Sequence, residues 1–174
     1  MDKLEKQKCP VCGENKLNLI EKEMDIPYFG KAYLFSMKCS GCDYSLSDVE
    51  SAEEKEPRKI EFEISNKKDL NVRLVKSSAA IIKIPQMRTT IEPGVGSEGY
   101  VSNIEGLLNR FKKVLEGQRD SAEEDSARKT AKNLLKKLWK VECGDEELKI
   151  VLEDQTGNSA IISDKSQVEK LKVK

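Results

Sequence analysis

The sequence contains no histidine among its 174 residues. Histidine is the commonest general base in enzymes and the usual protein ligand of catalytic zinc. No apolar run approaches the roughly 18 residues that a membrane-spanning helix requires. The first six residues, Met1-Asp2-Lys3-Leu4-Glu5-Lys6, contain no apolar core of a secretion signal. We therefore expect a cytoplasmic protein that is not an enzyme.

The chain also lacks an excess of either charge. Lysine plus arginine and aspartate plus glutamate both number 31, so the formal net charge is zero. Residues 1–50 hold seven basic and nine acidic side chains, so neither half is strongly basic. Dedicated nucleic-acid binders usually carry such a basic excess. The charge balance therefore counts against nucleic-acid binding, which we keep as the alternative function.

Four of the five cysteines form two C-x-x-C pairs, Cys9-Pro10-Val11-Cys12 and Cys39-Ser40-Gly41-Cys42. Two such pairs are the ligand set of a structural zinc site, and Gly13 follows the first pair where a tight turn favours glycine. The 26 residues between Cys12 and Cys39 exceed the roughly 15–20 of compact zinc ribbons. This spacing predicts a finger with an extended hairpin.

Other chemistries also use cysteine pairs. Redox C-x-x-C motifs usually occur singly at the start of a helix, and disulfides need an oxidising compartment. The paired pattern favours zinc over both, with Cys9, Cys12, Cys39 and Cys42 as the expected ligands. Four thiolates fill a tetrahedral ion and leave no position for substrate, so such a metal stabilises the fold. Cys143 has no sequence partner and is expected to be a small core residue at a helix end.

The chain divides into an expected zinc-ribbon finger at 1–50 and a β-rich domain at 57–174, separated by a polar run that ends at Pro57. Alternating residues predict a strand over 31–38, entering the second cysteine pair. Before it, Tyr28 and Phe29 lie in a turn. They could form an exposed binding tip, although packing within the finger is the favoured interpretation.

The second domain shows strands, then helices, then strands. Strand patterns cover 60–64, 70–74, 79–84, 148–152 and 160–162, with a further edge strand expected over 168–173. A capping box beginning at Ser102 and a stop at Gly117 predict one helix. A second capping box at Ser121 and a stop at Gly144 predict another. We expect a mainly β fold with a helical hairpin inserted at about 102–143.

A glycine-rich segment and a basic segment could each be a binding site or an ordinary part of the fold. Gly94-Val95-Gly96-Ser97-Glu98-Gly99 matches the dinucleotide fingerprint. That fingerprint requires a buried strand directly before it, but here Pro93 interrupts the connection between strand and loop. In addition, the Glu98 carboxylate would repel a phosphate. A flexible connecting loop is the better interpretation. Residues 128–140 carry basic side chains and no acid. They could contact RNA or an acidic protein, although a solvated helix face is favoured.

Several motifs, taken in order, resemble the ZPR-type zinc-finger family. They are Cys9-Pro10-Val11-Cys12-Gly13, Ile26-Pro27-Tyr28-Phe29-Gly30, residues 36–44, Asp69-Leu70-Asn71, Val75-Lys76-Ser77-Ser78, Ile82-Lys83-Ile84-Pro85, Ile91-Glu92-Pro93-Gly94 and residues 99–108. The resemblance implies a four-cysteine finger followed by a double-stranded β-helix domain that carries a helical hairpin. It also aligns the four paired cysteines with the ligands of one structural Zn²⁺.

Eukaryotic members of this family hold two such modules and bind translation elongation factor one-alpha, assisting its folding or maturation. They are also linked to receptor kinase tails and nuclear trafficking. One module is typical of a prokaryotic, archaeal member. The resemblance thus implies a zinc-binding protein-interaction module, a chaperone or assembly factor for a translational GTPase. Tyr28, Phe29 and the 94–99 loop are the expected contact points. The alternative is a nucleic-acid-binding zinc-ribbon protein.

Overall fold

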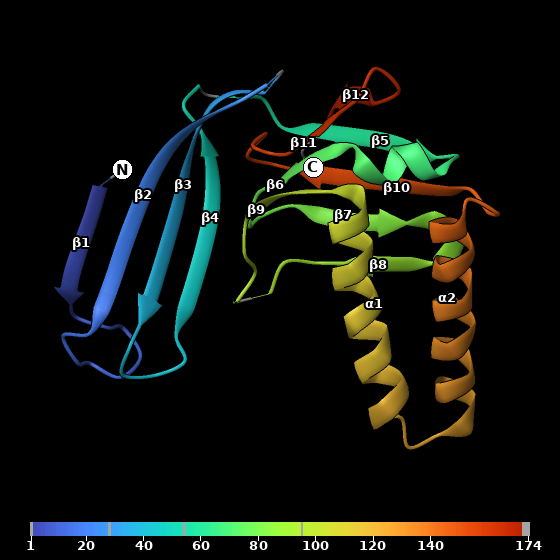
Figure 1. Ribbon diagram of the computed structural model, residues 1–174, viewed down its shortest axis with the longest axis horizontal. Coiled ribbons are helices and arrows are strands. Elements are labelled where there is room, and N and C mark those ends of the chain that lie inside the picture. The colour runs from blue at the N-terminus through green and yellow to red at the C-terminus, as the bar shows by residue number, and fades with distance from the viewer. Residues whose placement is uncertain (1, 28, 54, 95, 172–174) are drawn as a thin grey trace.

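The computed structural model describes residues 2–27, 29–53, 55–94 and 96–171 (Figure 1). Its N-terminal part is an antiparallel sheet with the strand order β1-β2-β3-β4, which we call the finger sheet. The strands are β1 (Asp2–Gln7), β2 (Leu17–Ile26), β3 (Gly30–Cys39) and β4 (Ser45–Ser51). β2 and β3 pair along their whole length, from Leu17 opposite Cys39 to Ile26 opposite Gly30. The extended hairpin predicted from the cysteine spacing is therefore confirmed.

The second part contains two sheets and two helices. One sheet has the order β12-β5-β10-β7-β8 and the other β11-β6-β9. The strands are β5 (Arg58–Ile64), β6 (Arg73–Lys76), β7 (Ile81–Ile84), β8 (Thr89–Ile91), β9 (Tyr100–Asn103), β10 (Leu148–Asp154), β11 (Ala160–Ile162) and β12 (Gln167–Lys170). The helices are α1 (Ile104–Ser121) and α2 (Asp125–Cys143), with short 3₁₀ turns η1 (Lys67–Asn71) and η2 (Pro85–Met87). No helix in the described ranges is long and apolar enough to cross a bilayer.

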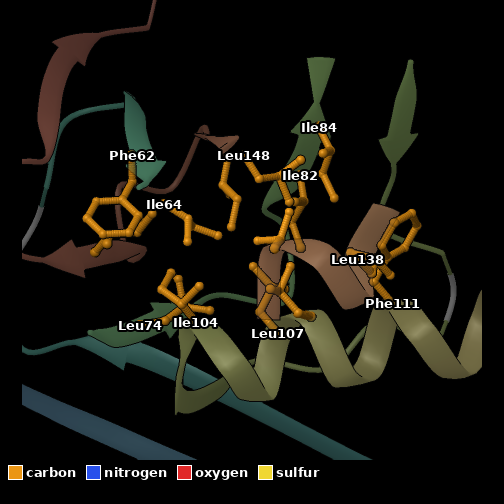
Figure 2. Close-up of a cluster of buried hydrophobic side chains, with 14 of the residues drawn as sticks. Phe62, Ile64, Leu74, Ile82, Ile84, Ile104, Leu107, Phe111, Leu138 and Leu148 are labelled. Atoms are coloured by element: carbon orange, nitrogen blue, oxygen red, sulfur yellow. The ribbon is translucent and has the colours of Figure 1, made fainter. Parts of the chain in front are cut away.

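The core of the second part lies between the sheets and the base of the helical pair. Phe62 and Ile64 of β5 are buried in this core, whereas the alternating residues Glu61 and Glu63 lie on the other face of the strand. The alternation in the sequence predicts this arrangement. Figure 2 shows the side chains of α1, α2 and the strands meeting in this core. The far end of the helical hairpin extends away from the sheets (Figure 1).

Several element boundaries differ from the prediction. Residues 67–71 form η1 in place of the first part of a strand, because Asn66 and Asp69 cap that turn reciprocally. α1 begins after Asn103, whose side chain accepts a hydrogen bond from the Gly106 N–H. It continues past Gly117 to Ser121, and α2 starts at Asp125 without a side-chain cap. The predicted stop at Gly144 is confirmed, with a left-handed φ of 79°.

The finger sheet and the second domain share a small apolar core. Ile26, Ala32 and Val49 from the inner face of the finger sheet pack with Val75 of β6. Phe29 belongs to the same cluster, so the favoured prediction that it packs is confirmed and its role as an exposed contact is wrong. The Lys55 ammonium lies 3.4 Å from its ring centroid. Tyr28, the other expected tip residue, lies outside the described residues.

Hydrogen bonds join the two parts beside this core. The Gly99 N–H donates to the Ser47 carbonyl over 2.9 Å, and the Ser78 N–H donates to Asp48 Oδ1 over 2.9 Å. Ser97 Oγ donates to the Ser78 carbonyl over 2.7 Å. The end of the 94–99 loop is thus anchored at the junction, which corrects the expected flexible connection. The Gly99 N–H, and the Ser97 N–H that donates to the Gly94 carbonyl, are therefore not free to bind a phosphate.

A fully buried carboxylate supports the junction from the second domain. Asp154 Oδ2 accepts hydrogen bonds from Ser77 Oγ (2.8 Å) and Ser159 Oγ (2.6 Å), and Oδ1 accepts from the Thr156 N–H (2.8 Å). Burial of this carboxyl opposes its ionisation. The donors of Ser159, Thr156 and Ser77 outweigh that effect, so the pKa of Asp154 lies below its ordinary value.

Gly99→Ala should loosen the junction. A Cβ at position 99 would lie 2.7 Å from the backbone nitrogen of Val49. The finger and the second domain would therefore have to move apart, or the backbone at the junction would be strained. We expect a loss of about 1–3 kcal/mol in chemical denaturation. Gly96→Ala is the control, because a Cβ there meets no atom within 4 Å. Equal stability of the two variants would contradict this account of the junction.

Asp154→Asn should destabilise the protein by about 2 kcal/mol at pH 7, because it removes a charged acceptor from several hydrogen bonds. The depressed folded-state pKa contributes stability above the unfolded value of about 4, which is lost as pH falls through the folded pKa. The difference between variant and parent in urea denaturation should therefore shrink below about pH 4. Asp164→Asn, at an exposed position, is the matched control. A difference independent of pH would refute the assignment.

Candidate metal centre

The hairpin of the finger sheet brings the two cysteine pairs together. Cys39 is the last residue of β3 and lies opposite Leu17 at the start of β2. The first turn closes through a hydrogen bond from the Gly13 N–H to the Cys9 carbonyl (3.0 Å), with a φ of 74° at Gly13. This left-handed conformation explains the glycine. The second turn is tied to the first by the Ser40 N–H, which donates to the Lys16 carbonyl over 3.0 Å.

The four cysteine sulfurs lie within 4.8 Å of one another. The Cys9 and Cys42 sulfurs are 3.8 Å apart, and those of Cys12 and Cys39 are 3.7 Å apart. A tetrahedral ion with zinc–sulfur bonds of about 2.3 Å requires sulfur–sulfur separations of about 3.8 Å. Two of the sulfur pairs already have this separation, so the residues present fit a single zinc ion.

The proximity of the sulfurs perturbs their acidity. Desolvation opposes ionisation of Cys9, but backbone N–H groups of Cys12 and Val11 and the neighbouring thiols lower the pKa of Cys9 to about 7. At Cys42 the backbone N–H of Tyr44 favours the thiolate, whereas desolvation and the other sulfurs raise the pKa to about 12. Four adjacent thiols cannot all ionise cheaply without a cation, and a bound divalent metal supplies that charge.

The surroundings of the cluster suit a structural site. Cys9 and Cys39 are buried, and Leu17, Leu19 and Met37 pack around them. The Gly41 N–H donates to Cys39 Sγ over 3.3 Å, as backbone groups in metal-binding turns do. Cys12 is exposed. All four positions of a tetrahedral ion are filled by protein sulfur, so the arrangement can hold a fold together and offers no open coordination position.

The remaining sequence candidates lie away from this cluster. Cys143 is the last residue of α2 and is half-buried, so it is not the core residue that the sequence suggested. On α2, Arg128 pairs with Asp125, and Lys137 and Lys140 approach Glu146. Lys129, Lys132 and Lys136 are exposed. The basic side chains of α2 thus form a solvated face.

Comparison with protein-family models identifies both parts of the chain. The model of the ZPR1 zinc-finger domain matches residues 3–57, and that of the ZPR1 jelly-roll domain matches residues 68–174. A jelly roll is the architecture also described as a double-stranded β-helix, so the predicted fold class is confirmed. The zinc-finger match and the clustered cysteines also confirm one structural Zn²⁺ as the cofactor.

Similar proteins occur in archaea and eukaryotes. An uncharacterized ZPR1-like protein of Methanocaldococcus jannaschii is 38% identical over 99% of this chain and 91% of its own length. Another from Pyrococcus horikoshii is 40% identical over 94% of this chain and 75% of its own length. The zinc finger chaperone zpr1 of Schizosaccharomyces pombe is 31% identical over 88% of this chain, which spans 33% of that protein. The chain therefore belongs to the ZPR1 family, with a zinc-finger domain followed by a jelly-roll domain.

Proposed function

We propose that this protein is a zinc-stabilised interaction module that acts as a chaperone or assembly factor for a translational GTPase of the elongation factor one-alpha type. The observation that carries the proposal is the rigid attachment of the finger to the jelly roll. A shared apolar core around Ala32 and Val49 and the bonds of Asp48 and Gly99 hold the finger in one orientation. Such a module presents a preorganised surface to a protein partner.

The chaperone role is supported by the similarity to the fission-yeast zinc finger chaperone. The GTPase partner comes from the motifs shared with the ZPR-type family, which include residues 99–108 at the junction. We place the protein in the cytoplasm, where such a partner is found. A binding role without catalysis also accords with the histidine-free sequence and the closed set of four thiols.

Within this function we assign Cys9, Cys12, Cys39 and Cys42 as the ligands of the structural Zn²⁺. Their sulfur separations support the assignment. The ion would join the two turns at one end of the finger sheet, so zinc binding and folding of this end are coupled. Ser97 and Gly99 are hydrogen-bonded at the junction, so only the first part of the 94–99 loop remains a candidate for partner contact.

Cys39→Ser should abolish stoichiometric zinc binding and unfold the metal-bound end of the finger. Structural zinc contributes on the order of 10 kcal/mol of binding free energy to such domains. Limited proteolysis should then cleave within residues 9–42, while the helical circular dichroism of the jelly roll survives. Cys143→Ser, outside the cluster, should retain one zinc. A Cys39→Ser protein that keeps one zinc or a protected finger would overturn the ligand assignment.

The partner assignment predicts that the zinc-loaded protein binds the elongation factor one-alpha-type GTPase of its own host. Isothermal titration with the GDP-bound, GTP-bound and nucleotide-free GTPase should show a preference for one state, because a folding factor distinguishes conformations of its client. Chelated protein is the control and should lose binding. Absence of binding in every state would refute the GTPase partner. Tight, steeply salt-dependent binding to RNA would then support the nucleic-acid alternative.

A further inference from the structure

The finger sheet has two faces of different character. Its inner face packs against the jelly roll through Ala32, Val49 and Ile26. Because side chains alternate along a strand, the residues between these point to the opposite side. We call this side the outer face. It comprises Asp2 and Leu4 of β1, Leu19, Glu21 and Glu23 of β2, Lys31, Tyr33, Phe35 and Met37 of β3, and Leu46, Asp48 and Glu50 of β4.

An apolar stripe runs along β3 in the middle of the outer face. Tyr33, Phe35 and Met37 are each half-buried, and the Tyr33 and Phe35 rings lie 6.5 Å apart between centroids with a tilt of 38°. β3 is an inner strand of the finger sheet (Figure 1), so its neighbours lie on both sides. The stripe therefore leaves aromatic surface in contact with solvent in the centre of a sheet.

Carboxylates border this stripe on both sides. The register places Phe35 opposite Glu21 on β2 and Asp48 on β4. Tyr33 lies opposite Glu23 and Glu50 in the same way. Directly opposed residues on one face have Cβ atoms about 5 Å apart. Glu21 and Glu23 of β2 and Glu50 of β4 therefore border the rings, whereas the Asp48 carboxylate binds Ser78 at the junction.

Some of these acids have no cation beside them. Glu23 pairs with Lys31 over 2.9 Å, and Asp48 accepts from backbone N–H groups at the junction. Among the described residues, no lysine or arginine lies within 4.0 Å of the carboxylates of Glu21 or Glu50. Asp2 lies directly across from Glu21, and like charges at such positions repel. A cation supplied by a partner would relieve this repulsion.

A hollow of about 200 Å³ adjoins the same residues. Its lining is mostly apolar and includes Leu4, Leu19, Phe35 and Met37, and Leu4 is 59% exposed. Leu19 and Met37 also pack against the buried cysteines, so the metal centre supports one wall of this hollow. A hollow of this kind accepts an apolar side chain, because burying it removes apolar surface from water.

We propose that the outer face binds a basic, amphipathic segment of a protein partner. An apolar side chain of the segment enters the hollow, and its lysine or arginine side chains lie over the Tyr33 and Phe35 rings, between Glu21 and Glu50. Cation–π attraction and charge pairing then act on the same cation. Nucleic acid does not suit this face, because its phosphates would meet carboxylates. The inference rests on the proposed function only in that the occupant is a protein.

The test uses the full-length, zinc-loaded protein and two probes. The first is a synthetic ten-residue peptide of five valines followed by five arginines, with a peptide of five valines followed by five glutamates as its counterpart. The arginine peptide should shift the amide resonances of β2 and β3, and the glutamate peptide should not. The second probe is the host's elongation factor one-alpha-type GTPase. Glu21→Lys/Glu50→Lys should weaken binding of the arginine peptide and the GTPase at least about tenfold.

Glu63→Lys/Glu92→Lys is the matched control, since it makes the same charge change at exposed positions of the jelly roll and should alter binding less than about twofold. Arginine-peptide shifts confined to other regions, or no arginine-peptide shifts at all, would overturn the inference. So would binding that survives the Glu21/Glu50 reversal. If the parent protein fails to bind the GTPase, the GTPase assignment fails and the peptide experiment alone decides the outer face.

Discussion

The close approach of four cysteine sulfurs is the constraint on which the finger depends. Two tight turns, each with few apolar side chains, must be held against the end of a long hairpin, and thiols at 3.7 and 3.8 Å would repel one another as thiolates. A divalent cation converts that repulsion into four bonds. The same cation fixes Leu19 and Met37, which pack on Cys9 and Cys39 and form part of the outer face. Metal binding and surface shape are thus physically linked.

The junction between finger and jelly roll connects the metal-bound finger to the rest of the protein. The finger sheet alone has a small apolar core, and its inner face becomes buried only by packing on Val75 and its neighbours. Asp48 and Gly99 add hydrogen bonds that define the approach of the two parts. Because a rigid surface loses less entropy on binding than a mobile one, this attachment is what suits the module to protein recognition.

Sequence patterns located most elements for simple physical reasons. Alternation in residues 60–64 and the helical spacing from Ile104 to Leu115 both arise from burial on one side, so they predicted β5 and α1. β1 has no such pattern, because all six of its residues are exposed, and it went unpredicted. Gly117 did not end α1, because an exposed glycine costs a helix only about 1 kcal/mol. The helix continues to Ser121, whose hydroxyl donates a hydrogen bond to the Gly117 carbonyl over 2.8 Å. Packing of Phe29 was the favoured prediction, but the contribution of Val75 to its cluster comes from the other domain and was not predictable from the sequence.

By itself, the sequence determined the metal centre and the class of fold. Cysteine spacing restricts which atoms can converge on one ion, and periodicity restricts which face of each element is buried, so both are local properties. The tertiary structure decided which face of the finger sheet packs on the jelly roll and which remains open. Both faces of β3 carry apolar side chains, so the pattern of β3 alone does not show which face is buried. Only the position of the second domain separates Ala32, which is buried, from Phe35, which is half-buried opposite Glu21. That choice depends on contacts between residues far apart in the chain.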